Sequence, residues 1–80
     1  MEKVVKVNLN NISSVKDFCN KNFKFDGMLT LKHSRYVIDA KSIMGIFSLD
    51  LTKDLDLHIE GETEEAVNTY VEEIKAYIVE

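Results

Sequence analysis

Apolar and polar residues alternate along four segments of the chain, the pattern typical of β-strands with one buried and one solvated face. The four segments are residues 3–9, 28–33, 36–40 and 54–60. The last of them, DLDLHIE, alternates most clearly, with Leu55, Leu57 and Ile59 on one side. A tight turn at Ser34 and Arg35 would join the second and third segments as a hairpin. The pattern therefore predicts four strands.

Three further segments have the spacing of three and four residues that is typical of amphipathic helices. They are residues 14–22, residues 43–49 and a longer segment after Gly61. Ser14 and Asp17 have the form of a capping box for the first helix, Ser42 can cap the second, and Thr63 can cap the third. The face shared by the first helix carries Val15, Phe18, Cys19 and Asn22. The apolar stripe of the third carries Val67, Val71, Ile74 and Ile78.

The predicted order of elements is β-α-β-β-α-β-α, which indicates an α+β fold. Four strands that each keep one polar face favour an antiparallel sheet with helices on one side only, an open-faced sandwich. A chain of 80 residues is long enough for one modest core. We expect residues 1–80 to form a single domain.

Composition narrows the classes of function. Apolar residues make up 45% of the chain and charged residues 30%, as in a soluble globular protein, and the net charge is −4. No basic stripe is present to neutralise phosphates, which argues against nucleic-acid binding. A single cysteine, Cys19, suits a reducing compartment. Neither a signal peptide nor an apolar run of about 18 residues is seen, so we expect a cytoplasmic protein without a membrane segment. We also expect a monomer.

The chain offers few residues for catalysis or metal binding. His33 and His58 have no second histidine or cysteine at ligand spacing, so no metal site is expected. The carboxylates Asp54, Asp56 and Glu60 could hold a hard cation, but a solvated strand face is the favoured interpretation. No glycine-rich phosphate loop occurs among the three glycines. We therefore expect neither an enzyme nor a bound cofactor.

Residues 39–47, DAKSIMGIF, are unusually apolar for a surface segment. On a helix capped by Ser42, one face would carry Ile46 and Leu49, and another would carry Ile43, Met44 and Phe47. Either all five apolar side chains are buried, or the second face is exposed as a protein docking surface. Gly45 either allows a close approach by a partner backbone or loosens the helix.

Residues 41–49, KSIMGIFSL, resemble the signature around the regulatory serine of the HPr family, the histidine-containing phosphocarriers of the bacterial sugar phosphotransferase system. The resemblance extends over nearly the whole chain through its order of elements. It implies an open-faced β-sandwich, with three helices over a four-stranded antiparallel sheet. It also places Ser42 at the serine phosphorylated by HPr kinase, and Ile43, Met44 and Phe47 on the family's apolar docking patch.

The family's phosphocarrier motif, Gly-Ile/Leu-His-Ala-Arg-Pro-Ala, falls on residues 9–15, LNNISSV. Asn11 then stands at the phosphohistidine position and Ser13 at the arginine. An amide has no nucleophilic nitrogen comparable to imidazole, so Asn11 cannot carry a phosphoryl group. At most, the helix N-terminus would remain as a weak anion site.

The resemblance therefore implies a regulatory protein. Its partners would be HPr kinase/phosphorylase, or another phosphotransferase-system or regulatory protein such as a catabolite-control transcription regulator. In the family, the interface with that regulator uses the loop in which Ser13 here replaces the arginine. One alternative is a constitutive binding module of the same fold in which Ser42 only caps the helix. A remoter alternative is an active phosphocarrier with a different acceptor.

Overall fold

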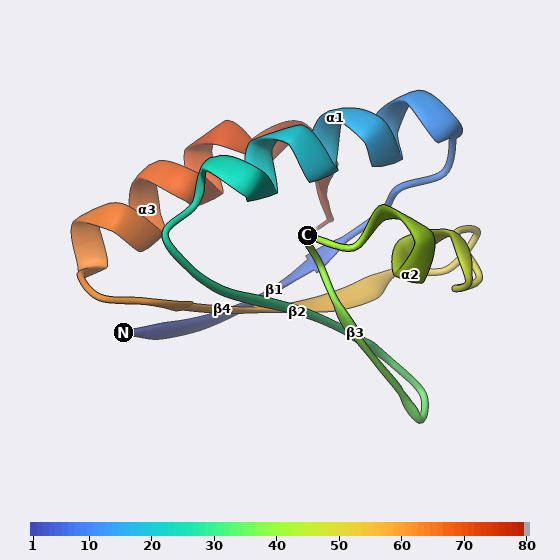
Figure 1. The fold of residues 1–80 in the computed structure, drawn as a ribbon, viewed down its shortest axis with the longest axis horizontal. Coiled ribbons are helices and arrows are strands. Elements are labelled where there is room, and N and C mark those ends of the chain that lie inside the picture. Colours follow the sequence, from blue (N-terminus) through green and yellow to red (C-terminus); the bar gives the residue numbers. More distant parts are fainter. Residues whose placement is uncertain (80) are drawn as a thin grey trace.

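Helices cover one face of a five-stranded antiparallel sheet in the computed structural model, which describes residues 1–79 (Figure 1). The elements in chain order are β1 (Glu2–Val7), α1 (Ile12–Lys24), β2 (Gly27–His33), β3 (Tyr36–Asp39), α2 (Ile43–Phe47), β4 (Leu55–Gly61), α3 (Glu64–Glu73), the 3₁₀ turn η1 (Lys75–Tyr77) and β5 (Ile78–Val79). The strand order is β3-β2-β4-β1-β5, and every neighbouring pair is antiparallel. The predicted α+β open-faced sandwich is confirmed.

The short strand β5 was not predicted from the sequence. The apolar stripe predicts a helix that continues to Ile78, but α3 ends at Glu73 and Ile78 lies in β5 opposite Val7 of β1. The N–H of Asn8 donates to the carbonyl of Tyr77 at 2.9 Å, which holds the chain end against the sheet. Ile78 packs against the core from a strand. The spacing of apolar residues alone could not tell whether Ile78 ends a helix or lies in a strand.

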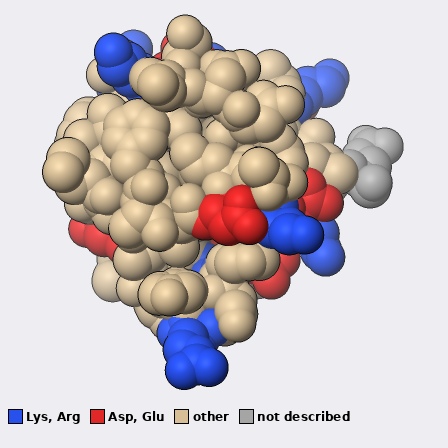
Figure 2. Space-filling model, turned by 90° about the vertical axis from the view of Figure 1, so that its right-hand side faces the viewer, with Lys and Arg blue, Asp and Glu red and all other residues tan. Residues whose placement is uncertain are grey.

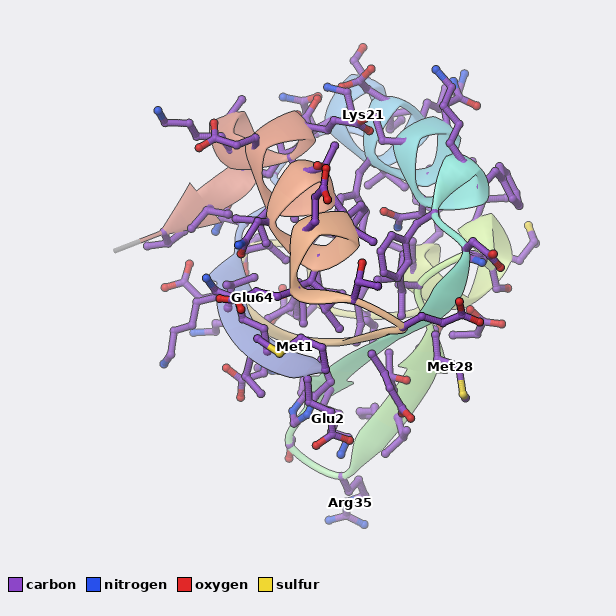
Figure 3. The ribbon with its side chains drawn as sticks, turned by 90° about the vertical axis from the view of Figure 1, so that its left-hand side faces the viewer. Met1, Glu2, Lys21, Met28, Arg35 and Glu64 are labelled. Atoms are coloured by element: carbon purple, nitrogen blue, oxygen red, sulfur yellow. The ribbon has the colours of Figure 1, made fainter. Side chains whose placement is uncertain are left out.

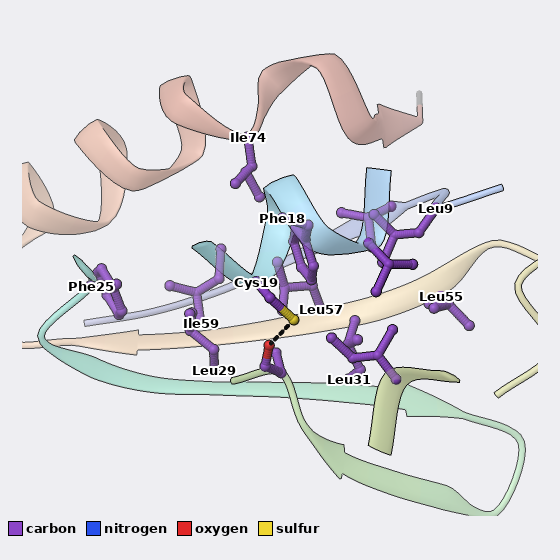
Figure 4. Close-up of a cluster of buried hydrophobic side chains, with 14 of the residues drawn as sticks. Leu9, Phe18, Cys19, Phe25, Leu29, Leu31, Leu55, Leu57, Ile59 and Ile74 are labelled. Atoms are coloured by element: carbon purple, nitrogen blue, oxygen red, sulfur yellow. Dashed lines mark hydrogen bonds between the residues drawn. The ribbon is translucent and has the colours of Figure 1, made fainter. Parts of the chain in front are cut away.

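The core lies between the helices and the covered face of the sheet (Figure 4). It is built from the alternating positions that the sequence pattern selects: Leu55, Leu57 and Ile59 of β4 are all at most 1% exposed. Cys19 is buried among them, with its Sγ 3.9 Å from the carbonyl oxygen of Ala40. Burial raises the pKa of the Cys19 thiol, so this group is a neutral core side chain at pH 7.

Asn22 is a fully buried polar side chain, and it joins three parts of the fold. Its Nδ2 donates to the carbonyl oxygen of Ala40 at 2.7 Å, and its Oδ1 accepts from the hydroxyl of Tyr70 on α3. Burial raises the pKa of Tyr70, which keeps this hydroxyl protonated as a donor. Asn22 therefore ties α1 both to α3 and to the segment that leads into α2.

Two glycines face each other where β2 and β4 pair, Gly27 opposite Gly61. The ring of Phe25 packs over both: a Cβ on Gly61 would lie 3.0 Å from its Cζ. A Cβ on Gly27 would overlap the backbone carbonyl oxygen of Glu60. The absence of side chains at both positions therefore allows Phe25 and the neighbouring strand to approach this closely.

The chain end is also fastened to α1 through Asp17. Its carboxylate accepts a hydrogen bond from the hydroxyl of Tyr77 and another, at 2.9 Å, from Nζ of Lys21. These two hydrogen bonds, that of Tyr77 first, hold the pKa of Asp17 below its usual value. The same contact raises the pKa of Tyr77 to about 12, so the phenol remains a donor across the neutral range.

We expect Tyr77→Phe to lower the free energy of unfolding at pH 7 by about 1 kcal/mol, the usual net worth of one hydrogen bond. Because the pKa of Asp17 is lower in the folded state, its contribution is present above its unfolded value near 3.8 and is lost as the pH falls through the folded value. The gap between the two proteins should therefore narrow as the pH falls from 3.8 through the lower folded-state pKa of Asp17. Urea unfolding at pH 7, 5 and 3 measures it, and a gap that stays constant would contradict this role for Tyr77.

Candidate functional site

Ser42 is the N-cap of α2, as the sequence predicts. Its backbone is extended, with φ −95° and ψ 105°, and its Oγ accepts a hydrogen bond from the N–H of Gly45 at 3.2 Å. The side chain is exposed. Oγ acts as an acceptor in this cap, so the cap does not use the O–H of Ser42.

The apolar residues of α2 and the residues after it divide between the core and the surface. Ile46 and Leu49 are buried, at 0% and 7% exposure. Met44 is 78% exposed and Phe47 38%, while Ile43 is partly buried against the core. The alternative in which all five are buried is therefore wrong. The helix ends at Phe47 rather than at 49, and Leu49 reaches the core from the turn that follows.

Gly45 faces the protein's own sheet. A Cβ at this position would lie 2.6 Å from Cγ2 of Ile38 on β3. Glycine at this position is therefore required for the close contact between α2 and β3 of the same chain. Neither reading of Gly45 in the sequence, approach by a partner or loosening of the helix, anticipated this contact.

Lys41, which precedes Ser42, is engaged with the backbone. Its Nζ donates to the carbonyl oxygens of Phe25 at 2.9 Å and of Gly27 at 3.1 Å. Its N–H donates to Oδ1 of Asp39 at 2.9 Å. The side chain therefore anchors the segment before Ser42 to the turn between α1 and β2. Sequence reasoning did not single it out, because the acceptors are backbone atoms that no sequence motif marks.

Asn11 is the N-cap of α1, and the predicted capping box at Ser14 and Asp17 is wrong. The backbone of Asn11 is extended, and its Oδ1 accepts from the N–H of Ser14 at 2.8 Å. The helix thus begins at Ile12, two residues before the predicted start, and runs on to Lys24. Asparagine and serine are equally good caps, so the pattern alone could not choose between them. The Asn11 side chain is exposed and serves as a helix cap.

Two other candidates from the sequence, His58 and Asp56, lie on β4. His58 is on the uncovered face of the sheet, between Val4 and Thr30 of the neighbouring strands. Asp56 lies between two lysines, Lys6 and Lys32, in the same strand pairings, which suits a solvated face. Within residues 1–79, no group of three or more His, Cys, Asp and Glu is placed to hold a metal ion. In the same range, no helix is both long and apolar enough to cross a membrane.

The structure brings residues 9–15 and residues 41–49, the two segments compared above with the HPr family, to the same end of the molecule. Helices α1 and α2 pack against each other, and the start of α1, with Asn11, lies at the end where α2 lies (Figure 1). Figure 2 shows this end, where a broad area carries no charged side chain. Ser42 is an exposed hydroxyl of this end, and Met44 and Phe47 are two exposed apolar side chains.

Comparisons with known proteins agree with this architecture. A family model described as the PTS HPr component phosphorylation site matches residues 5–80. The crystal structure of the phosphocarrier protein HPr from Bacillus anthracis is similar, with 26% identity, a TM-score of 0.66 and coverage of 91% of this chain and 94% of that one. That of HPr-C-His from Thermoanaerobacter tengcongensis is similar in fold, with 24% identity, a TM-score of 0.69 and coverage of 95% and 92%. No curated protein gave a significant match.

Proposed function

Because this chain belongs to the HPr family of the phosphotransferase system, we propose that it is a non-enzymatic regulatory member of that family. In this proposal a single domain, in the cytoplasm, docks onto a protein partner through Ile43, Met44 and Phe47. Ser42 is the switch, phosphorylated by HPr kinase/phosphorylase. Nucleic acid and membrane are not direct partners.

The observation that carries the proposal concerns two residues, Ser42 and Asn11. An exposed hydroxyl stands at the start of α2, close in sequence to the exposed Met44. Asn11, which the resemblance to the family puts at the phosphohistidine position, is the N-cap of α1. The Asn11 amide offers no nucleophile for a high-energy phosphoryl group. Serine phosphorylation is therefore the modification that this end of the molecule supports best.

A phosphate on Ser42 would act by local electrostatics. It adds about −1.5 to −2 charges at pH 7 together with three strong acceptor oxygens. The N–H groups that begin α2 would tolerate the charge, so the domain keeps its fold. The docking surface, whose exposed members are Met44 and Phe47, would gain a charge at its edge, which changes its preferred partner.

The experiment is incubation of the full chain with HPr kinase/phosphorylase and ATP, followed by intact-mass analysis. We expect one phosphate on the wild type and none on Ser42→Ala. Ser48→Ala is the matched control, because Ser48 lies at the other end of α2 and is also exposed. Equal labelling of the wild type and Ser42→Ala, or no labelling of either, would remove Ser42 as the switch.

A second candidate function is a constitutive docking module. It is favoured by the 78% exposure of Met44, which holds without any modification. A partner that Met44→Asp abolishes but Ser42→Asp leaves unchanged would support this function over the switch.

A further inference from the structure

A pocket of about 420 Å³ lies between the end of α1 and α3, at the opposite end of the molecule from α2 (Figure 1). Figure 3 looks onto this end. The rings of Phe25 and Tyr70 line the pocket, with their centroids 4.8 Å apart. Because both residues are buried, their rings form the floor of the pocket rather than its rim. The pocket shares no residue with the docking surface of the proposed function.

The side chains around this aromatic floor are mostly acidic. Three carboxylates and one ammonium group line the pocket, those of Asp26, Glu65, Glu73 and Lys24. Within residues 1–79 the one salt bridge joins Lys21 to Asp17, on α1. In that range, therefore, no ion pair neutralises the three carboxylates of the pocket.

The acidic surface continues along α3 beyond the pocket. Residues 62–73, ETEEAVNTYVEE, contain five glutamates and neither lysine nor arginine. Residues four apart on a helix lie on one face, so α3 carries two parallel rows of exposed side chains: Glu64, Asn68 and Glu72 in one, and Glu65, Thr69 and Glu73 in the other. Each row has a glutamate at both ends, eight residues or about 12 Å apart.

The stability of α3 does not account for the acidic residues at its end. Glu64 and Glu65 lie in the first turn, where the helix dipole favours negative charge. Glu72 and Glu73 lie in the last turn, where the dipole disfavours it, and that turn has no basic residue to offset them. A placement that costs local stability indicates a role outside the helix.

We propose that the pocket and the two glutamate rows bind a basic segment of a partner protein, with one arginine side chain over the rings of Phe25 and Tyr70. A guanidinium group is planar, stacks on aromatic rings and pairs with carboxylates, so it suits both the floor and the rim. Residues four apart in an extended segment are about 13 Å apart, so two basic side chains match the two ends of a row. The inference does not depend on Ser42.

Other kinds of ligand fit this end less well. Within residues 1–79, no group of three or more His, Cys, Asp and Glu is placed to hold a metal ion. The start of α3 could attract an anion, but Glu64 and Glu65 occupy its first turn, and the Oγ of Thr63 accepts from the N–H of Ala66. A small organic cation would fill only the pocket. A polyamine could span a row but has no planar group for the rings.

The test is an NMR titration of the ¹⁵N-labelled full chain with an acetylated, amidated peptide in which three serines separate two arginines. At about 50 mM NaCl and pH 7 we expect saturable shifts, largest in residues 24–27 and 63–73, with a Kd below about 1 mM. About 300 mM NaCl should raise this Kd at least about fivefold, because charge pairs form the complex. The peptide with both arginines replaced by alanine should not bind, and spermidine should bind at least about tenfold more weakly.

Two pairs of substitutions remove the same charge from different places. Glu65→Gln/Glu73→Gln should raise Kd at least about tenfold. Glu2→Gln/Glu60→Gln is the matched control, because these exposed residues face each other across β1 and β4 on the uncovered face of the sheet, and it should change Kd less than about twofold. Thr69→Lys puts a lysine four residues from both Glu65 and Glu73, so it should stabilise α3 and abolish binding.

Four results would each overturn the proposal. They are the absence of saturable shifts at about 5 mM peptide, shifts centred on α2 or on the uncovered face of the sheet, equal effects of the two double variants, and spermidine binding as tight as that of the peptide. The last result would make a polyamine the ligand. Labelling of Ser42 by HPr kinase bears on none of them, so this proposal and the proposed function can fail separately.

Discussion

Gly27→Ala is expected to lower the free energy of unfolding by about 3 kcal/mol, the upper end of the usual cost of overpacking. The added methyl would overlap the backbone carbonyl oxygen of Glu60 on the paired strand and also meet the ring of Phe25. A backbone atom within a sheet cannot move aside without breaking the pairing of β2 with β4. Urea unfolding followed by circular dichroism at 222 nm measures the change.

Gly61→Ala is the matched control, because Gly61 lies directly opposite Gly27 in the same pairing. Its added methyl would meet only side-chain atoms, Cγ2 of Val67 at 2.9 Å and Cζ of Phe25 at 3.0 Å. These can shift by a few tenths of an ångström, so we expect a cost of about 1 to 2 kcal/mol. A larger loss from Gly61→Ala than from Gly27→Ala would contradict this account of the glycine pair.

Asn22→Leu is expected to cost about 3 kcal/mol, because it removes the hydrogen-bond partner of two buried polar groups at about 1 to 3 kcal/mol each. The groups are the Tyr70 hydroxyl, which is left without a partner, and the Ala40 carbonyl, which keeps only the 3.9 Å contact with Sγ of Cys19. Asn20→Leu is the control on the exposed side of α1, and it should change the free energy of unfolding by less than about 0.5 kcal/mol.

The double variant Asn22→Leu/Tyr70→Phe sharpens this test. Removing the Tyr70 hydroxyl, which Asn22→Leu leaves without a partner, should recover part of the lost stability. The two changes should therefore be non-additive by at least about 0.5 kcal/mol. Equal losses from Asn22→Leu and Asn20→Leu, or strict additivity of Asn22→Leu and Tyr70→Phe, would show that the Asn22 bridge does not hold α1, α3 and the Ser42 segment together.

Much of the fold follows from the spacing of apolar residues. The alternation in residues 54–60 identifies β4 and the side of it that is buried, and the spacing in α1 places Val15, Phe18 and Cys19 in the core. These features depend on residues that are close together in the sequence. The strand β5 was missed because its pairing partner is β1, more than 70 residues earlier in the chain.

The candidate site was predicted in part. The cap at Ser42 and the division of the apolar residues of α2 follow from local spacing and from the resemblance to the HPr family. The roles of Lys41, Gly45 and Asn22 depend on backbone atoms or side chains that folding brings from elsewhere, such as Tyr70 of α3 for Asn22. Local sequence does not mark such partners, so these roles needed the structure.

The most direct test of the central claim offers the chain two phosphoryl donors in parallel. One reaction contains phosphoenolpyruvate and the general phosphotransferase enzyme, with a histidine-containing member of the family as the positive control. The other contains ATP and HPr kinase/phosphorylase. Intact-mass and peptide analysis should find no phosphate on this chain in the first reaction and one phosphate, on Ser42, in the second. Phosphate transferred from phosphoenolpyruvate to His33, His58 or any other residue would contradict the claim and make the chain a phosphocarrier.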